Sequence, residues 1–314
     1  MNNTLRTATA DKIRILSLPD QIVWCGSIVE DENGVSHLFF SHWDARHGFE
    51  AWCTRSRIGY ARADSPDGPF QFEKTILPDS RGPAWQRDVA HNPTAFFHDG
   101  RFYLYFMGNY GDGEFWTHRN HQNIGVASAA DPRGEWKISG PLLSDDQAVL
   151  FSNPTVCRRP DGKFLMIYKW VAKQRPAPFY GPVRHGVAMA DWPEGPFSII
   201  ARDLFQISGI DFPGEDPFLF YRDGSYFCIL KDNGQNYSTL SRGLIRFRSP
   251  DGIHWTDPEG VLSRRLIFDD GSKRRIYRLE RPQLLFRHNG EVRLLCAAKP
   301  SKNSDHTFLV SFDI

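Results

Sequence analysis

Three acidic residues, Asp88, Asp216 and Glu280, each stand shortly before a proline and an apolar run in this 314-residue sequence. Carboxyl groups that lie close together and are partly desolvated disfavour simultaneous ionisation, which raises the pKa of at least one of them. Glycoside hydrolysis uses such a pair: a protonated carboxyl protonates the leaving oxygen, while an ionised one activates water or attacks the anomeric carbon. The three residues are therefore candidate catalytic acids, although an acid before a strand can also cap a turn.

An internal repeat predicts a fold that would bring these acids together. Four segments share a polar residue, a proline, an apolar run, a turn containing Asp-Gly or Asn-Gly, and a second apolar run; they begin at His91, Ser152, Glu215 and Glu280. Their prolines are separated by 61, 63 and 65 residues. A fifth, weaker copy begins at Gly26 and has Ser27 in place of the proline.

Each copy is typical of a β-hairpin, because Asp-Gly and Asn-Gly supply the positive φ angles of a tight turn between two strand-like runs. A second repeat follows in four of the units, each time after a further apolar strand: SPDGPF, ADPRGEW, WPEGPF and SPDGIHW. Each unit of about 60 residues thus reads as four strands. Repeated four-stranded antiparallel sheets form the blades of a β-propeller.

Five such units predict an all-β fold, a single five-bladed β-propeller domain of residues 1–314 with four-stranded antiparallel blades. The last unit is incomplete, since only HTFLVSFDI remains after its hairpin to supply a strand. The beginning of the chain, KIRILSLP, resembles the fourth strands of other units. We therefore expect an N-terminal strand to close the last blade and to remove its open edge.

The innermost strand of a propeller blade runs along the central axis, so its first residues meet the end of the second strand on one face. This arrangement would gather the three acids, with Glu215 and His91 as further candidate catalytic residues. The same positions supply candidate substrate-binding residues: Trp24, Asp44, Asn92, Asn153, Lys169, Lys231 and Arg281. Their cations could bind a carboxylate, sulfate or phosphate of the substrate, or could pair with the axial carboxylates and tune their pKa values.

The repeat, with Asp216-Pro217 and with SPDGPF after a third strand, resembles the five-bladed glycosidases of families 43, 32, 68, 62 and 117 over nearly the whole chain. In families 43 and 32, an aspartate base or nucleophile, a supporting aspartate and a glutamate proton donor stand on innermost strands of the first, third and fourth blades. The resemblance implies that this chain is a glycoside hydrolase.

The sequence departs from the family pattern in blade one, where Trp24 and Cys25 stand at the position of the expected aspartate. Asp88, Asp216 and Glu280 occupy blades two, four and five, which is the same relative spacing advanced by one blade. By resemblance, this spacing implies the roles of base, supporting acid and proton donor in that order.

Other assignments of the catalytic roles stay open in the sequence. Glu215 could replace Asp216 in either role, and Asp44 could supply the missing base of blade one. His91 could act as the acid, as a histidine does in family 117.

Composition narrows the classes of function. Lysine and arginine (38) nearly cancel aspartate and glutamate (37), so the net charge of +1 predicts neither nucleic acid nor a membrane surface as partner. The sequence lacks a signal-peptide pattern and a long uncharged stretch, and its five cysteines lack CxxC spacing, which together favour a cytoplasmic protein. The histidines lack a zinc-site pattern, so we expect no metal and no cofactor.

We therefore expect an inverting, exo-acting hydrolase of a short oligosaccharide, which could contain an acidic or anhydro sugar and which could act as a homo-oligomer. One alternative is a glycoside phosphorylase resembling family 130, whose basic residues would hold phosphate and whose turnover would depend on it. The other is a non-catalytic propeller that binds carbohydrate or protein, for which acids repeated near the axis would be unnecessary.

Overall fold

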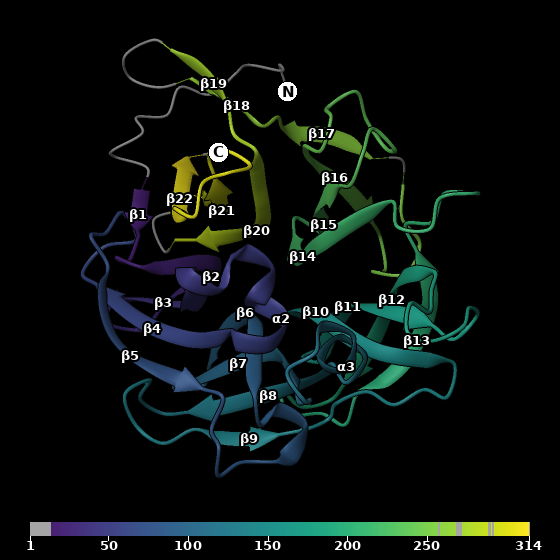
Figure 1. Ribbon diagram of the computed structural model, residues 1–314, viewed down its shortest axis with the longest axis horizontal. Coiled ribbons are helices and arrows are strands. Elements are labelled where there is room, and N and C mark those ends of the chain that lie inside the picture. Colours follow the sequence, from purple (N-terminus) through teal and green to yellow (C-terminus); the bar gives the residue numbers. More distant parts are fainter. Residues whose placement is uncertain (1–13, 257, 268–271, 288–289, 291, 314) are drawn as a thin grey trace.

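Each of the five repeat units forms a four-stranded antiparallel sheet, and the sheets surround a central axis as propeller blades (Figure 1). The computed structural model describes residues 14–256, 258–267, 272–287, 290 and 292–313. In the first four blades, the strands lie side by side in the order in which the chain forms them. The prediction of an all-β, five-bladed propeller is confirmed.

The first four blades follow one another along the chain. Blade one consists of β2 (Gln21–Glu30), β3 (Ser36–Asp44), β4 (Arg57–Ala63) and β5 (Gln71–Leu77). Blade two consists of β6 (Val89–His98), β7 (Arg101–Asn109), β8 (Asn123–Ala129) and β9 (Lys137–Ser139). Blade three consists of β10 (Ala148–Arg158), β11 (Phe164–Ala172), β12 (Val183–Ala190) and β13 (Ser198–Leu204). Blade four consists of β14 (Gly214–Arg222), β15 (Ser225–Asp232), β16 (Leu244–Ser249) and β17 (Glu259–Leu262).

Blade five combines the two ends of the chain. It consists of β20 (Arg278–Phe286), β21 (Val292–Lys299), β22 (Phe308–Asp313) and β1 (Arg14–Leu16). β1 pairs antiparallel with β22, with Leu16 opposite Leu309, and the side chains of Ile15 and Leu16 are buried. The N-terminal strand thus closes the last blade, as predicted, and covers the edge of β22.

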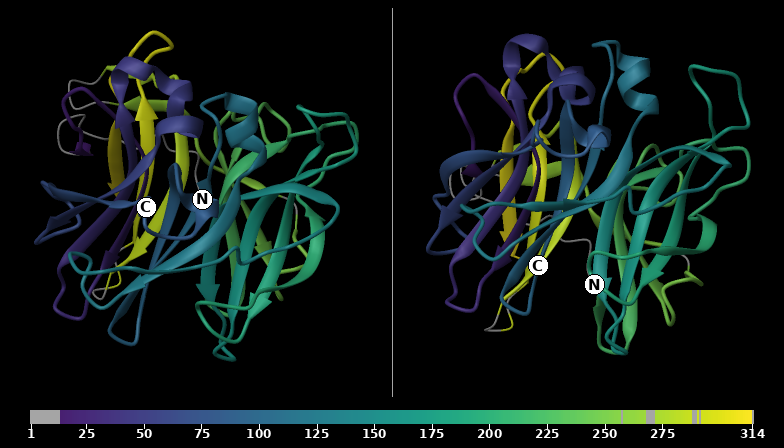
Figure 2. Two further views of the ribbon diagram at one scale, coloured as in Figure 1. Left: turned by 60° about the horizontal axis from the view of Figure 1, so that its bottom comes forward. Right: turned by 90° about the horizontal axis from the view of Figure 1, so that it is seen from below.

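Short helical turns and one hairpin lie outside the blades. The helical turns are η1 (Ala45–His47), η2 (Phe49–Ala51), α2 (Trp52–Arg55), η3 (Ala84–Gln86) and α3 (Phe115–Asn120). The hairpin consists of β18 (Arg265–Ile267) and β19 (Lys273–Arg275) and stands between blades four and five in the chain. Figure 2 shows α2 and α3 on the same face of the ring. None of the helices formed by the described residues has the length and apolar character that a membrane crossing requires.

Large apolar side chains pack between neighbouring blades. Between blades one and two, Phe39 and Tyr60 pack with Phe102 and Leu104, and all four are buried. Burying a side chain of this size stabilises the fold by about 1.5–3 kcal/mol. This packing fixes the positions of the blades relative to one another. It therefore also fixes the first residues of the innermost strands, which form the candidate site.

Each innermost strand contains a break in its pairing register at the same repeated position. One residue per blade has a positive φ there: Cys25 (52°), Asn92 (56°), Asn153 (51°), Asp216 (60°) and Arg281 (57°). Asn and Asp adopt this conformation more readily than other residues with a side chain. A bulge of this kind re-aims a side chain out of the regular strand pattern, and here it brings one side chain from every blade together.

Candidate active site

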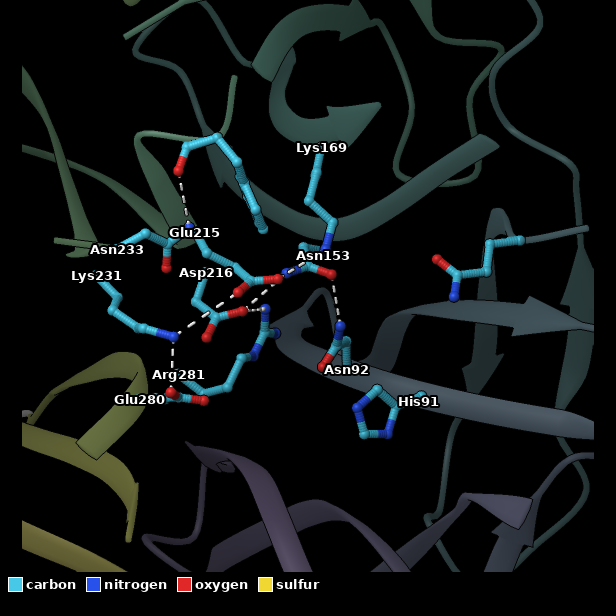
Figure 3. Close-up of polar contacts among 12 residues, drawn as sticks. His91, Asn92, Asn153, Lys169, Glu215, Asp216, Lys231, Asn233, Glu280 and Arg281 are labelled. Atoms are coloured by element: carbon cyan, nitrogen blue, oxygen red, sulfur yellow. Dashed lines mark hydrogen bonds and ion pairs between the residues drawn. The ribbon is translucent and has the colours of Figure 1, made fainter. Parts of the chain in front are cut away.

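Hydrogen bonds link the five bulge residues into an open ring around the axis, which runs from Cys25 to Arg281 and is shown in part in Figure 3. The Cys25 thiol donates to Asn92 Oδ1 (2.9 Å), and Asn92 Nδ2 donates to Asn153 Oδ1 (2.6 Å). Asn153 Nδ2 donates to Asp216 Oδ1 (2.8 Å), and Arg281 Nη1 donates to the same oxygen (3.4 Å). All five side chains are buried, so the ring forms the floor of the site.

Asp216 is the carboxyl group of this ring. Its residue is only 5% exposed, and burial, together with the negative charge of Glu215, raises the pKa of its carboxyl to about 6. Arg281 and Lys231 oppose this rise but do not cancel it. Among the described residues, both hydrogen bonds to the carboxyl end on Oδ1, and Oδ2 accepts none.

A layer of alternating charges lies beside the ring. Its acids, Glu215 and Glu280, each precede a bulge residue, and its lysines, Lys169 and Lys231, lie on the second strands. Lys169 Nζ lies 2.8 Å from Glu215 Oε1, and Lys231 Nζ lies 3.8 Å from Glu215 Oε2. Lys231 Nζ also lies 2.6 Å from Glu280 Oε1. The strand register explains these contacts, because Glu215 is opposite Lys231 and Ser152 is opposite Lys169. Figure 3 shows the two glutamates on either side of the Lys231 ammonium.

The adjacent carboxyls of Glu215 and Asp216 have opposite pKa shifts. Burial by itself would raise the pKa of Glu215. The positive charges of Lys169 and Lys231 outweigh burial and lower the pKa to about 2. The Glu215 side chain is 23% exposed, so solvent reaches it. Asp216 has no lysine within hydrogen-bonding distance among the described residues, and its pKa is raised. Neighbouring carboxyls whose pKa values are shifted in opposite directions are typical of acid–base sites.

Arg278 completes the charged layer at blade five, and the sequence analysis did not single it out. Its Nη1 lies 3.6 Å from Glu280 Oε1, and its Nη2 lies 3.6 Å from Glu50. The guanidinium stands 4.8 Å from the centre of the Phe49 ring, and Lys299 Nζ stands 5.2 Å from the same centre. Aligning the five repeat units could not have identified Phe49, because it lies in the helical turns after β3, which have no counterpart in the repeated hairpins.

His91 is enclosed on the blade-two side of the ring. Its Nδ1 lies 2.8 Å from Ser56 Oγ, its Nε2 lies 3.8 Å from the Cys25 sulfur, and the Trp52 ring stacks on it at 5.2 Å. Burial, with the charges of Arg281 and Lys169, lowers the pKa of His91 well below its usual value. The imidazole is therefore neutral near pH 7. Because it lacks the extra proton of an imidazolium, we do not assign it as the catalytic acid.

Two of the predicted site residues, Asp88 and Asp44, make their contacts elsewhere, and a third, Trp24, packs against the Phe49 ring that also contacts Arg278. Asp88 pairs with Arg87 and accepts a hydrogen bond from the Gly111 amide, and no described residue of the axial cluster contacts it. Trp24 is buried, with its ring packed edge-on against Phe49 at 4.9 Å. Asp44 caps η1 and pairs with the exposed Arg46.

The axial position of blade two is therefore occupied by Asn92, four residues after Asp88. The three carboxyls that share one cluster are Glu215, Asp216 and Glu280, all from blades four and five.

The predicted anion-binding cations of the axis all have carboxylate partners. Lys169 pairs with Glu215, Lys231 with Glu215 and Glu280, and Arg281 with Asp216. Of the two readings that the sequence left open for these cations, the structure favours the one in which they tune the carboxylates. Within the described part of the chain, His, Cys, Asp and Glu do not gather in groups of three or more that could hold a metal ion.

No family model and no curated protein matches this sequence, but solved structures match the fold over nearly its whole length. An α-L-arabinofuranosidase from Lactobacillus brevis is 12% identical (TM-score 0.65; 98% of this chain, 94% of that one). An exo-1,5-α-L-arabinanase from a bovine ruminal metagenomic library is 13% identical (0.63; 98% and 96%). A family 43 β-xylosidase/α-arabinofuranosidase from a compost microbial metagenome, in complex with xylotriose, is 15% identical (0.66; 98% and 94%). This chain therefore has the five-bladed fold found in glycoside hydrolases of family 43.

Proposed function

We propose that this chain is a glycoside hydrolase whose acid–base pair is Asp216 and Glu280. The observation that carries the proposal is the cluster of Glu215, Asp216 and Glu280 on the axial face, in which the pKa of Asp216 is raised while that of the adjacent Glu215 is lowered. A buried group of three carboxyls costs free energy in the unbound protein. The presence of these three carboxyls on two adjacent blades is better explained by a catalytic role than by a contribution to the stability of the fold.

Asp216 is assigned as the proton donor. Its pKa of about 6 keeps a fraction of the carboxyl protonated near neutral pH, and its Oδ2 is free of the ring hydrogen bonds among the described residues. Glu215 supports this role, because its negative charge raises the pKa of Asp216 while its own carboxylate is bound by Lys169 and Lys231. This assignment gives Asp216 the proton-donor role in place of the supporting role that the resemblance implies.

Glu280 is assigned as the base. Lys231 and Arg278 both approach its Oε1, and no described residue binds its Oε2, which can therefore accept a proton from an attacking water. Direct attack by water would invert the anomeric configuration. The five ring side chains are buried, and we expect a sugar chain that reaches them to enter by its end, which would favour exo action.

The test is a turnover screen of the purified protein, with and without phosphate. Arabinosides and xylosides, the substrates named for the structural neighbours, should be included beside neutral and acidic oligosaccharides. We expect phosphate-independent release of a terminal sugar, with inversion visible in a proton NMR time course. Turnover that required phosphate would support a phosphorylase instead. The proposal would be abandoned if D216N and E280Q both retained wild-type turnover on every hydrolysed glycoside.

A further inference from the structure

Four arginines stand together where blades four and five meet. Arg242 ends the loop before β16, Arg264 follows β17, and Arg265 and Arg275 belong to the hairpin of β18 and β19. No described residue forms a salt bridge with any of the four. We call Arg242, Arg264 and Arg275 the rim arginines.

The rim arginines lie at the same end of the blades as the candidate site. Lys231, near the end of β15, is opposite Leu244, the first residue of β16, and Leu244 is opposite Leu262 at the end of β17. The loop ending at Arg242 and the segment beginning after Leu262 therefore emerge beside Lys231. Arg275 is three residues before Arg278, which contacts Glu280.

Backbone contacts hold the Arg264 guanidinium in place. The residue is only 8% exposed. Its Nη1 donates to the carbonyl of Tyr277, and its Nε donates to the carbonyl of Ser241 at 3.3 Å. The Ile276 amide donates to the Arg264 carbonyl at 2.9 Å. The guanidinium is thus a fixed positive charge between the segments that carry Arg242 and Arg275.

The arrangement concentrates positive charge at a cost to the unbound protein. Burial lowers the pKa of Arg264, and the charges of Arg275 and Arg242 lower it further. Arg265 lies directly opposite Arg275 in the hairpin, and like charges that face each other across two strands are destabilising. A bound anion would relieve this repulsion through charge-assisted hydrogen bonds, for which guanidinium groups are well suited.

We propose that the rim arginines bind the carboxylate or sulfate of an acidic saccharide whose terminal glycosidic bond lies at Asp216 and Glu280. This inference rests on the proposed function, since it requires that the axial face takes a saccharide. It places anion recognition at a different position from the axial lysines, whose charges are already neutralised by Glu215 and Glu280. Glu280 and the rim are close enough that the Glu280 charge acts on Arg264.

Calorimetric binding can test the subsite in a D216N background, in which turnover is blocked. The probes are trigalacturonate, a sulfated galactotriose and neutral galactotriose. We expect the parent to prefer both acidic probes over the neutral one, and R242Q/R275Q to reduce that preference at least tenfold. K137Q/R158Q removes the same charge from exposed positions elsewhere and should leave the preference unchanged. A preference for only one acidic probe would identify the anion as carboxylate or sulfate.

The subsite is excluded if the parent binds neither acidic probe, if it binds all three equally, or if R242Q/R275Q keeps the parent's preference. The hydrolase proposal fails separately. Absence of turnover on every glycoside, together with arginine-dependent binding of an acidic probe, would remove the catalytic assignment and leave the anion subsite in place.

Discussion

The Lys231 ammonium lies 2.6 Å from Glu280 Oε1, although the two residues belong to different blades and are 49 positions apart in the chain. The same ammonium lies 3.8 Å from Glu215. Burial lowers the pKa of Lys231, but the two glutamates outweigh it, so that the pKa is raised overall. One buried cation thus stabilises two carboxylates and joins blade four to blade five.

Removing that cation should destabilise the protein. We expect K231M to lower the free energy of unfolding by about 3–5 kcal/mol, because it leaves buried carboxylates without their partner. Urea unfolding monitored by tryptophan fluorescence would measure the change. K231M/E280Q should recover part of the loss, whereas K163M, which breaks an exposed pair with Asp191, should change stability little. Equal effects of K231M and K163M would contradict the buried-pair interpretation.

The pH dependence of turnover should follow Asp216. A proton donor with a pKa of about 6 is protonated below that pH, so kcat/KM should fall as pH rises through about 6. In E215Q this limb should move to lower pH, because the charge of Glu215 helps to raise the pKa of Asp216. E259Q, which alters an exposed glutamate paired with Arg246, serves as the matched control. A limb that stays at the same pH in E215Q would argue against Asp216 as the titrating group.

The roles of Asp216 and Glu280 can be separated with substrates that differ in leaving group. D216N should lose about 10²–10⁴-fold in kcat on an ordinary glycoside and much less on a glycosyl fluoride, which needs no protonation of its leaving group. E280Q should lose activity on both substrates, because the attacking water is not activated in either case. The opposite pattern would make Glu280 the proton donor, as the family resemblance implies.

Glu215 and Asp216 should affect stability with opposite signs as pH changes. Glu215 has a folded-state pKa of about 2, below its ordinary value, so its contribution is present above that ordinary value and is lost as pH falls towards 2. The raised pKa of Asp216 gives a contribution that is present at low pH and is lost as pH rises through about 6. Between pH 5 and pH 3, E215Q should therefore lose less stability than the wild type in urea unfolding. A larger loss in E215Q would refute the assignment.

Asn153 should stabilise the ring both by its amide and by its backbone conformation. N153A removes the hydrogen bond to Asp216 Oδ1 and leaves Asn92 Nδ2 without its acceptor, which should cost about 1–3 kcal/mol. Alanine at a φ of 51° adds strain of about 1–2 kcal/mol. N153G loses the same bonds without that strain and should be the more stable of the two in thermal unfolding. If N153A unfolded at the wild-type temperature, the ring would not contribute to stability.

The sequence by itself determined the propeller. Asp-Gly and Asn-Gly turns between apolar runs are local signals, and their repetition every sixty-odd residues fixed the number of blades and the position of each innermost strand. The closing strand was also predictable, because KIRILSLP carries the pattern of the fourth strands. The sequence left two readings open for Lys231, anion binding or pairing with an axial carboxylate, and the strand register places it opposite Glu215.

Only the tertiary structure decided which acids share a site. Side chains alternate between the faces of a strand, so a small offset along the chain changes where a carboxyl points. Asp216 stands in the bulge and joins the ring, whereas Asp88 stands before β6 and pairs with Arg87. Lysine partners of the carboxylates come from other blades: Lys231 of blade four binds Glu280 of blade five, and Lys169 of blade three binds Glu215 of blade four. Such long-range electrostatics depend on distances in space, which a linear pattern of residue types does not contain.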